Sequence, residues 1–188
     1  ASCLVGSELC IRDRLIPDGE VLDLACGAGR HSRLLAQHGH TVLAVDRNAE
    51  ALALAAGAGI QTMQVDLETD DPAKNWPFPA ARFAGIVVTN YLHRPLWGSL
   101  VASLADHGVL IYETFALGNE QFGKPSNPDF LLAHGELLEV AREYGLLVVA
   151  YEDGYVEQPK PAVVQRICLV KAGNKADNGL KVTNLRLN

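Results

Sequence analysis

Short apolar runs alternate with helical patterns along the 188 residues of the chain. Uninterrupted apolar, β-capable runs predict strands that are buried on both faces. The seven predicted strands cover residues 20–25, 41–46, 60–65, 83–89, 109–115, 146–151 and 162–171. The four predicted helices between them cover residues 30–38, 49–56, 96–104 and 135–144. Segments 68–82 and 118–129 are rich in turn-forming residues, and both are predicted to be mostly loop.

This alternation predicts an α/β fold with a doubly wound, mostly parallel seven-stranded sheet and helices on both faces, because right-handed crossovers place connecting helices on the faces. The last two strands have no helix-length connector. They are therefore expected to form a C-terminal antiparallel hairpin through the loop around Gly154 and Pro159. Residues 1–171 are expected to form one domain. The polar tail 172–188 is either flexible or adds an edge strand at 182–187.

Charge and cysteine content narrow the function classes. The chain carries 22 acidic and 16 basic residues, a net charge of −6, which disfavours a broad role in coating nucleic acids or anionic lipids. A local basic patch remains compatible with this balance. The four cysteines form no CxxC pair, so reduced cysteines and no metal site are expected. No apolar segment has signal-peptide or membrane-span length, which predicts a cytoplasmic protein without a membrane partner.

A glycine pair marks the end of the first predicted strand, in the sequence Asp23-Leu-Ala-Cys-Gly27-Ala-Gly29. A backbone that turns sharply beside a ligand needs residues without a Cβ, and the following helix directs free N–H groups at the same place. A GxG at a strand end is also compatible with a purely structural tight turn.

Two acidic residues end the next two predicted strands. Asp46 lies 19 positions after Gly27, near the spacing at which a carboxylate accepts ribose hydroxyls. Its alternative role is a helix N-cap. Asp66 could accept from an adenine amine while Leu67 packs on the ring, and its alternative role is an Asx turn. Because all three features lie at carboxyl ends of successive strands, together they predict a nucleoside cofactor.

Asp23 selects among nucleoside cofactors. An ionised carboxylate this close to the glycines would repel the pyrophosphate of NAD, whereas it would attract the sulfonium and ammonium groups of S-adenosylmethionine. The glycine pattern matches the dinucleotide fingerprint only in part, because Ser32 stands where the third glycine is expected. A dehydrogenase is therefore the lesser alternative.

The segments VLDLACGAGRHS, AVD and QVDLE together resemble the class I S-adenosylmethionine-dependent methyltransferases. The chain is also similar to tellurite-resistance-type small-molecule methyltransferases and to a bacterial subgroup without an assigned substrate that shares the 112–132 stretch. The resemblance implies S-adenosylmethionine as cofactor. The candidate cofactor-binding residues are Asp23, Ala25, Cys26, Gly27, Gly29, His31, Asp46, Arg47, Asp66, Leu67 and Asn90.

Acceptor chemistry is expected beside the ends of the fourth and fifth predicted strands. The candidate catalytic residues are Asn90, Tyr91, His93 and Glu113. Asn90-Tyr91 matches only part of the pattern of enzymes that methylate amide or ring nitrogens, so nucleobase amino methylation is not supported. His93 is either a base or a surface histidine. Glu113 contacts the acceptor or forms a salt bridge with Arg94 or Lys124.

The loop 116–132 is predicted to be a lid over the acceptor, with Phe122 and Phe130 as walls, or else a solvated connection. The leading hypothesis is methyl transfer to a small molecule. RNA- or protein-directed transfer and a non-catalytic S-adenosylmethionine-binding module are the alternatives, and the oligomeric state stays open.

Overall fold

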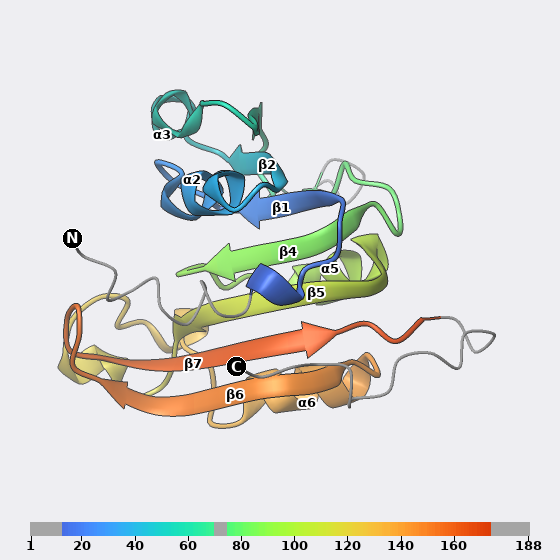
Figure 1. Cartoon of the computed structure of the whole chain (residues 1–188). Coiled ribbons are helices and arrows are strands. Elements are labelled where there is room, and N and C mark those ends of the chain that lie inside the picture. Colours follow the sequence, from blue (N-terminus) through green and yellow to red (C-terminus); the bar gives the residue numbers. More distant parts are fainter. Residues whose placement is uncertain (1–12, 70–74, 174–188) are drawn as a thin grey trace.

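A single seven-stranded sheet forms the centre of the computed structural model, which describes residues 13–69 and 75–173. The strand order is β3-β2-β1-β4-β5-β7-β6 (Figure 1). The strands are β1 (Glu20–Leu24), β2 (Thr41–Asp46), β3 (Ile60–Gln64), β4 (Phe83–Thr89), β5 (Leu104–Phe115), β6 (Leu147–Val156) and β7 (Ala162–Val170). β1 to β5 pair in parallel, and β7 is antiparallel to both β5 and β6. The predicted mostly parallel sheet with a closing antiparallel hairpin is confirmed.

Helices cover both faces of the sheet, as its two-sided apolar pattern requires. They are α2 (Arg30–Gln37), α3 (Ala49–Ala55), α5 (Trp97–Ser103) and α6 (Glu136–Glu143). Leu100 of α5 and Leu137 of α6 pack with Leu22 and Ile86 in one core cluster. Leu35 of α2 packs with Val21 and residues of other strands in the cluster on the other face. Alternate strand residues thus face opposite cores, which explains the uninterrupted apolar runs.

Two predicted boundaries are wrong. β5 begins at Leu104 rather than 109, where its pairing with β4 shifts register between Phe83 and Gly85. β6 continues to Val156, so Gly154 lies inside the hairpin strand, opposite Val164, and only Pro159 lies in the turn. Local composition indicates a turn at Gly154, but pairing with β7 extends the strand through it.

The connection after β5 is more ordered than a plain loop. It contains the 3₁₀ turns η3 (Asn119–Gln121) and η4 (Pro128–Phe130). In Figure 1 this connection and the β6–β7 turn both lie at the edge where β1 and β4 end. That edge is where open α/β sheets bind ligands. The predicted tail 172–188 falls almost wholly outside the described residues, and no helix within them is long and apolar enough to cross a membrane.

Candidate cofactor and acceptor site

The glycine turn after β1 uses its two glycines for different reasons. Both have positive φ, +54° at Gly27 and +75° at Gly29. A Cβ on Gly29 would lie 2.5 Å from the Cβ of Ala55 in α3, whereas a Cβ on Gly27 would meet no atom within 4 Å. Gly29 is therefore needed for helix packing. Gly27 leaves open space beside the turn.

Asp46 ties the end of β2 to this turn. Its Oδ2 accepts from the Gly27 N–H at 2.8 Å, and its Oδ1 accepts from the Asn48 N–H at 2.8 Å. The alternative reading of Asp46 as a helix N-cap is wrong, because Asn48 caps α3 by accepting from the N–H groups of Glu50 and Ala51. Each carboxylate oxygen of Asp46 retains a further lone pair for a ligand hydroxyl.

A cavity of about 210 Å³, here called the acidic cavity, lies at the carboxyl ends of β1, β2 and β3. Its lining includes the predicted cofactor residues Ala25, Asp46, Arg47, Asp66 and Leu67, and also Val45, Val65, Glu68 and Tyr91. Asp66 also accepts from the Glu68 N–H, so the Asx turn considered as its alternative role is present as well. With three acidic side chains and one arginine, the formal charge of the lining is −2.

Asp23 lies beneath the glycine turn and is fully buried. Its Oδ2 accepts from the Ser32 hydroxyl at 2.5 Å, while its Oδ1 has no hydrogen-bond partner among the described residues. Burial raises the pKa of Asp23 to about 6, against the hydrogen bonds from Ser32 and the charge of Arg30, which lower it. A buried oxygen without a partner is uncommon in native structures and points to a missing donor.

Cys26 and His31 are both uncharged near neutral pH. Burial and the carboxylates of Asp23 and Asp46 raise the pKa of the Cys26 thiol to about 12. Burial lowers the pKa of His31 to about 4, with a smaller contribution from Arg30. The His31 ring lies 3.0 Å from the Thr89 hydroxyl at the end of β4, so it joins α2 to that strand. Its predicted contact with a cofactor stays a prediction.

The end of β4 links the acidic cavity to the rest of the site. Asn90 adopts a positive φ of +55°, which asparagine tolerates better than most residues. A linking cavity of about 220 Å³ is lined by Glu68, Asn90, Tyr91, Phe115 and Phe130, among others. It shares Tyr91 with the acidic cavity. His93, by contrast, precedes the 3₁₀ turn η2 (Arg94–Leu96) and lines none of these cavities.

A larger cavity of about 660 Å³, here called the basic cavity, shares Asn90 and Phe115 with the linking cavity. Its walls come from Arg30, from the connection after β5, and from the β6–β7 hairpin. The predicted wall residue Phe122 lines it, and Phe130 lines the linking cavity. Whether the loop 116–132 closes as a lid stays a prediction.

Glu113 lines the basic cavity, but its partner differs from both predicted ones. Its Oε2 accepts from Arg166 Nε at 2.8 Å, and Arg166 Nη1 also lies 3.3 Å from Glu152. The three residues are cross-strand neighbours on β5, β7 and β6. The predicted salt bridge with Arg94 or Lys124 is wrong, because neither of those residues is its partner in the register.

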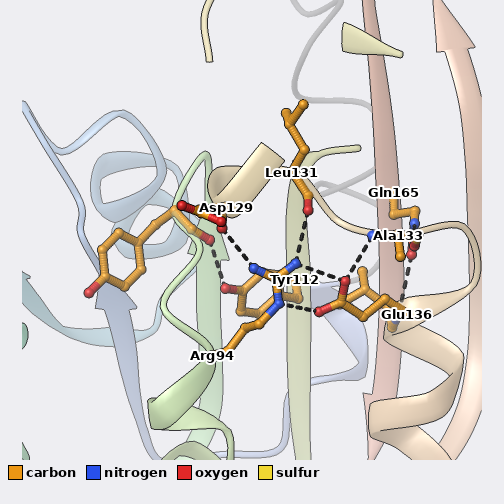
Figure 2. Close-up of polar contacts among 9 residues, drawn as sticks. Arg94, Tyr112, Asp129, Leu131, Ala133, Glu136 and Gln165 are labelled. Carbon is orange, nitrogen blue, oxygen red and sulfur yellow. Dashed lines mark hydrogen bonds and ion pairs between the residues drawn. The ribbon is translucent and has the colours of Figure 1, made fainter. Parts of the chain in front are cut away.

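Arg94 instead anchors the connection after β5 (Figure 2). It forms a two-pronged ion pair with Glu136 and donates to the carbonyls of Asp129 and Leu131. Beside it, the buried Tyr112 donates to the Tyr91 carbonyl at 2.7 Å. Both the Asn90–Tyr91 segment and the base of the connection are thereby held in place.

Sequence reasoning missed the Arg166 pairing and gave Lys124 and Glu68 no ligand-facing role. The pairing of Arg166 with Glu113 depends on the register of β7 against β5, which local sequence patterns do not reveal. Lys160, which lies between two prolines in the sequence, also lines the basic cavity. Within residues 13–69 and 75–173, no three His, Cys, Asp or Glu side chains gather as a metal site. Among these residues, neither Cys26 nor Cys168 forms a disulfide bond.

The glycine turn and the acidic cavity thus lie together at the carboxyl edge of a Rossmann-like sheet. Residues 21–107 match the family model described as a methyltransferase domain. Protein-L-isoaspartate O-methyltransferase from Chlorobaculum tepidum is 32% identical over 108 residues, which are 56% of this chain. The chain spans about half of that relative, 49% of its length.

Solved structures share the fold at low sequence identity. TehB from Haemophilus influenzae aligns with a TM-score of 0.70 and 20% identity, over 87% of this chain and 61% of that one. An S-adenosylmethionine-dependent methyltransferase from Mesorhizobium loti aligns with a TM-score of 0.66 and 17% identity, over 87% and 96%. Over residues 21–107 and in its fold, this chain is similar to the S-adenosylmethionine-dependent methyltransferases, whose cofactor is S-adenosylmethionine.

Proposed function

We propose that this chain transfers a methyl group from S-adenosylmethionine to a small-molecule acceptor. The observation that carries the proposal is the meeting of two cavities of opposite charge at the end of β4. The linking cavity lies between the acidic cavity and the basic cavity. Tyr91 lines both the linking cavity and the acidic cavity, and Asn90 lines both the linking cavity and the basic cavity. A cofactor in one and an acceptor in the other would meet beside Asn90 and Tyr91.

The residues of the acidic cavity and the glycine turn fit the cofactor. Asp46 would hold the ribose hydroxyls, and Asp66 with Leu67 would frame the adenine. The unpartnered Oδ1 of Asp23 is a buried acceptor near the glycine turn, where the ammonium group of the methionine portion would supply the missing donor. A formal lining charge of −2 favours a cation over the pyrophosphate of NAD.

Transfer of a methyl group from a sulfonium is an in-line displacement, so the protein contributes mainly by aligning the reacting atoms. Alignment of two reactants can lower a barrier by about 7–11 kcal/mol. Asn90 and Tyr91 lie where this alignment is needed, and Tyr112 fixes their backbone. Glu113 is held by Arg166, so the proposal does not depend on a carboxylate base. His93 as a base stays a prediction.

The size of the basic cavity favours a small acceptor. Its volume of about 660 Å³ falls within the ordinary range for small-molecule sites. The likeness to TehB supports the same class only by fold. The relative from C. tepidum is named for a protein acceptor, so protein-directed transfer is the competing proposal.

Calorimetric titration with S-adenosylhomocysteine and, separately, with NAD tests the cofactor half. We expect S-adenosylhomocysteine to bind at micromolar concentration and NAD not to compete with it. Preferential binding of NAD would instead establish a dehydrogenase. Release of S-adenosylhomocysteine from S-adenosylmethionine, measured with metabolite extract below and above a size cut-off, tests the acceptor half. Turnover only with the macromolecular fraction would overturn the small-molecule proposal, and cofactor binding without turnover on either fraction would favour a non-catalytic module.

A further inference from the structure

The basic cavity has the opposite sign of charge to the whole chain. Five ionisable side chains line it, and four of them are cationic: Arg30, Lys124, Lys160 and Arg166, against Glu113 alone. The formal charge of the lining is thus +3, in a chain of net charge −6. Concentrating positive charge in a hollow of an acidic protein focuses the local field on anions.

The four cations differ in how far their charge is already compensated. Arg166 is neutralised by Glu113 and Glu152. Arg30 begins α2 beside the glycine turn and therefore lies on the cofactor side. In the described part of the chain, neither Lys124 nor Lys160 forms an ion pair or a side-chain hydrogen bond. These two ammonium groups are the uncompensated charges on the side of the cavity away from the glycine turn.

Lys124 and Lys160 come from separate segments that converge on one hollow. Lys124 follows η3 in the connection after β5, and Lys160 lies in the β6–β7 turn. Anchoring of the first segment by Arg94 and of the second by the β5–β7 pairing brings both to the same edge. A ligand between them would thus be bound from two sides.

Apolar side chains supply the rest of the wall. Phe115, Phe122, Val164 and Pro161 line the cavity. The Phe122 ring packs against Tyr155 with centroids 5.2 Å apart, although Phe122 is 46% exposed. An exposed aromatic ring that is supported from behind suits a ligand with a flat or apolar body.

We propose that the methyl acceptor is a small organic anion, whose carboxylate or phosphate group binds between Lys124 and Lys160 while its apolar body packs on Phe122. The proposal deepens the proposed function and rests on it, since the basic cavity is an acceptor site only if the acidic cavity holds the cofactor. An extended polyanion is disfavoured, because two lysines in a hollow do not make the long basic track that a phosphate backbone requires.

The test uses a matched pair of fluorescent probes on the whole chain saturated with S-adenosylhomocysteine. Anilinonaphthalenesulfonate is the anionic probe, and phenylnaphthylamine has the same aromatic body without the sulfonate. The variant carries both Lys124→Gln and Lys160→Gln. The control is Arg142→Gln, which removes one positive charge from α6 outside the cavity. Loss of these two exposed charges should weaken binding of the anionic probe about tenfold. The affinity of the double variant for the neutral probe should change by less than about twofold. The affinity of the control variant for either probe should also change by less than about twofold.

Competition then separates the two anion types. Phenyl phosphate and benzoate share a ring, so whichever displaces the anionic probe more strongly identifies the preferred group, while benzyl alcohol should not displace it. Equal affinity of the double variant and the wild type for the anionic probe would overturn the inference. So would displacement by benzyl alcohol as strong as by the two anions. Calorimetry with S-adenosylhomocysteine on the same samples distinguishes the failures: normal cofactor binding with unchanged probe binding rejects only the anionic acceptor, whereas no cofactor binding rejects the proposed function as well.

Discussion

The acidic cavity and the basic cavity lie at one edge of the sheet, yet they are built in different ways. The acidic cavity draws on residues 25–91, from strands that follow one another along the chain. The basic cavity draws on residues 30–166, and its central ion pair joins β5 to the antiparallel β7. One is a local assembly of strand ends, and the other depends on long-range pairing. The proposed cofactor cavity therefore has a local construction, whereas the proposed anion site forms only when β7 pairs with β5.

The largest effect is expected from Asp46→Ala in the acidic cavity. Hydrogen bonds to a charged group contribute about 1.5–3 kcal/mol each, so the loss of ribose contacts should weaken S-adenosylhomocysteine binding about 100-fold. Calorimetry measures this affinity, and thermal unfolding measures the accompanying loss of the bonds from Gly27 and Asn48. Probe binding in the basic cavity should stay unchanged. An unfolded variant whose folded fraction binds normally would make Asp46 structural.

Substitutions at the two glycines should separate effects on fold stability from effects on cofactor binding. Gly29→Ala would force a Cβ against Ala55 at positive φ, which should destabilise the fold by about 2–5 kcal/mol. Gly27→Ala adds a methyl group in open space, so it should lower stability by only about 1–2 kcal/mol.

Cofactor affinity is expected to fall more in Gly27→Ala than in Gly29→Ala. The new methyl group at Gly27 would occupy space proposed for the methionine portion, and S-adenosylhomocysteine binding should fall about tenfold or more, as expected when a close approach is blocked. Chemical denaturation and calorimetry on both variants give the two readouts. If Gly27→Ala bound the cofactor normally, the glycine turn would not face it.

The same contrast between local and long-range construction explains which features could be predicted from the sequence. The mostly parallel sheet and its closing hairpin follow from local periodicity and connector length. The acidic residues at the ends of β2 and β3 follow from their spacing, because parallel strands end at one edge. The partner of Glu113 could not be predicted in this way. Arg166 is 53 positions away, and a register error of one residue would have turned it to the opposite face. The prediction that Gly154 lies in the hairpin loop is wrong for the same reason, because only pairing with β7 shows that β6 continues through Gly154.

A pH titration tests the proposed role of Asp23 beneath the glycine turn. Burial raises the pKa of Asp23 to about 6 from 3.8. The folded state therefore holds a proton that the unfolded chain has released, and this residue's contribution to stability falls as pH rises between those values. A bound ammonium group favours the ionised carboxylate. S-adenosylhomocysteine affinity should rise up to about tenfold from pH 5 to pH 7, and Asp23→Asn should remove most of that rise in calorimetry. An unchanged profile in Asp23→Asn would assign the pH dependence to another group.

The smallest effect is expected from Glu113→Gln, which makes the basic cavity more positive. Arg166 then loses one of its two carboxylates, so the anionic probe should bind about threefold more tightly, within the range of a partly exposed ion pair. Glu152→Gln is the matched control, because Glu152 also pairs with Arg166 but does not line the cavity. Its effect on the probe should be smaller, and neither change should alter S-adenosylhomocysteine affinity. If Glu113→Gln left probe binding unchanged but abolished methyl transfer, Glu113 would act on the acceptor directly, as the position of the residue at the end of β5 first suggested. The charge of the cavity would then serve catalysis rather than selection of an anion.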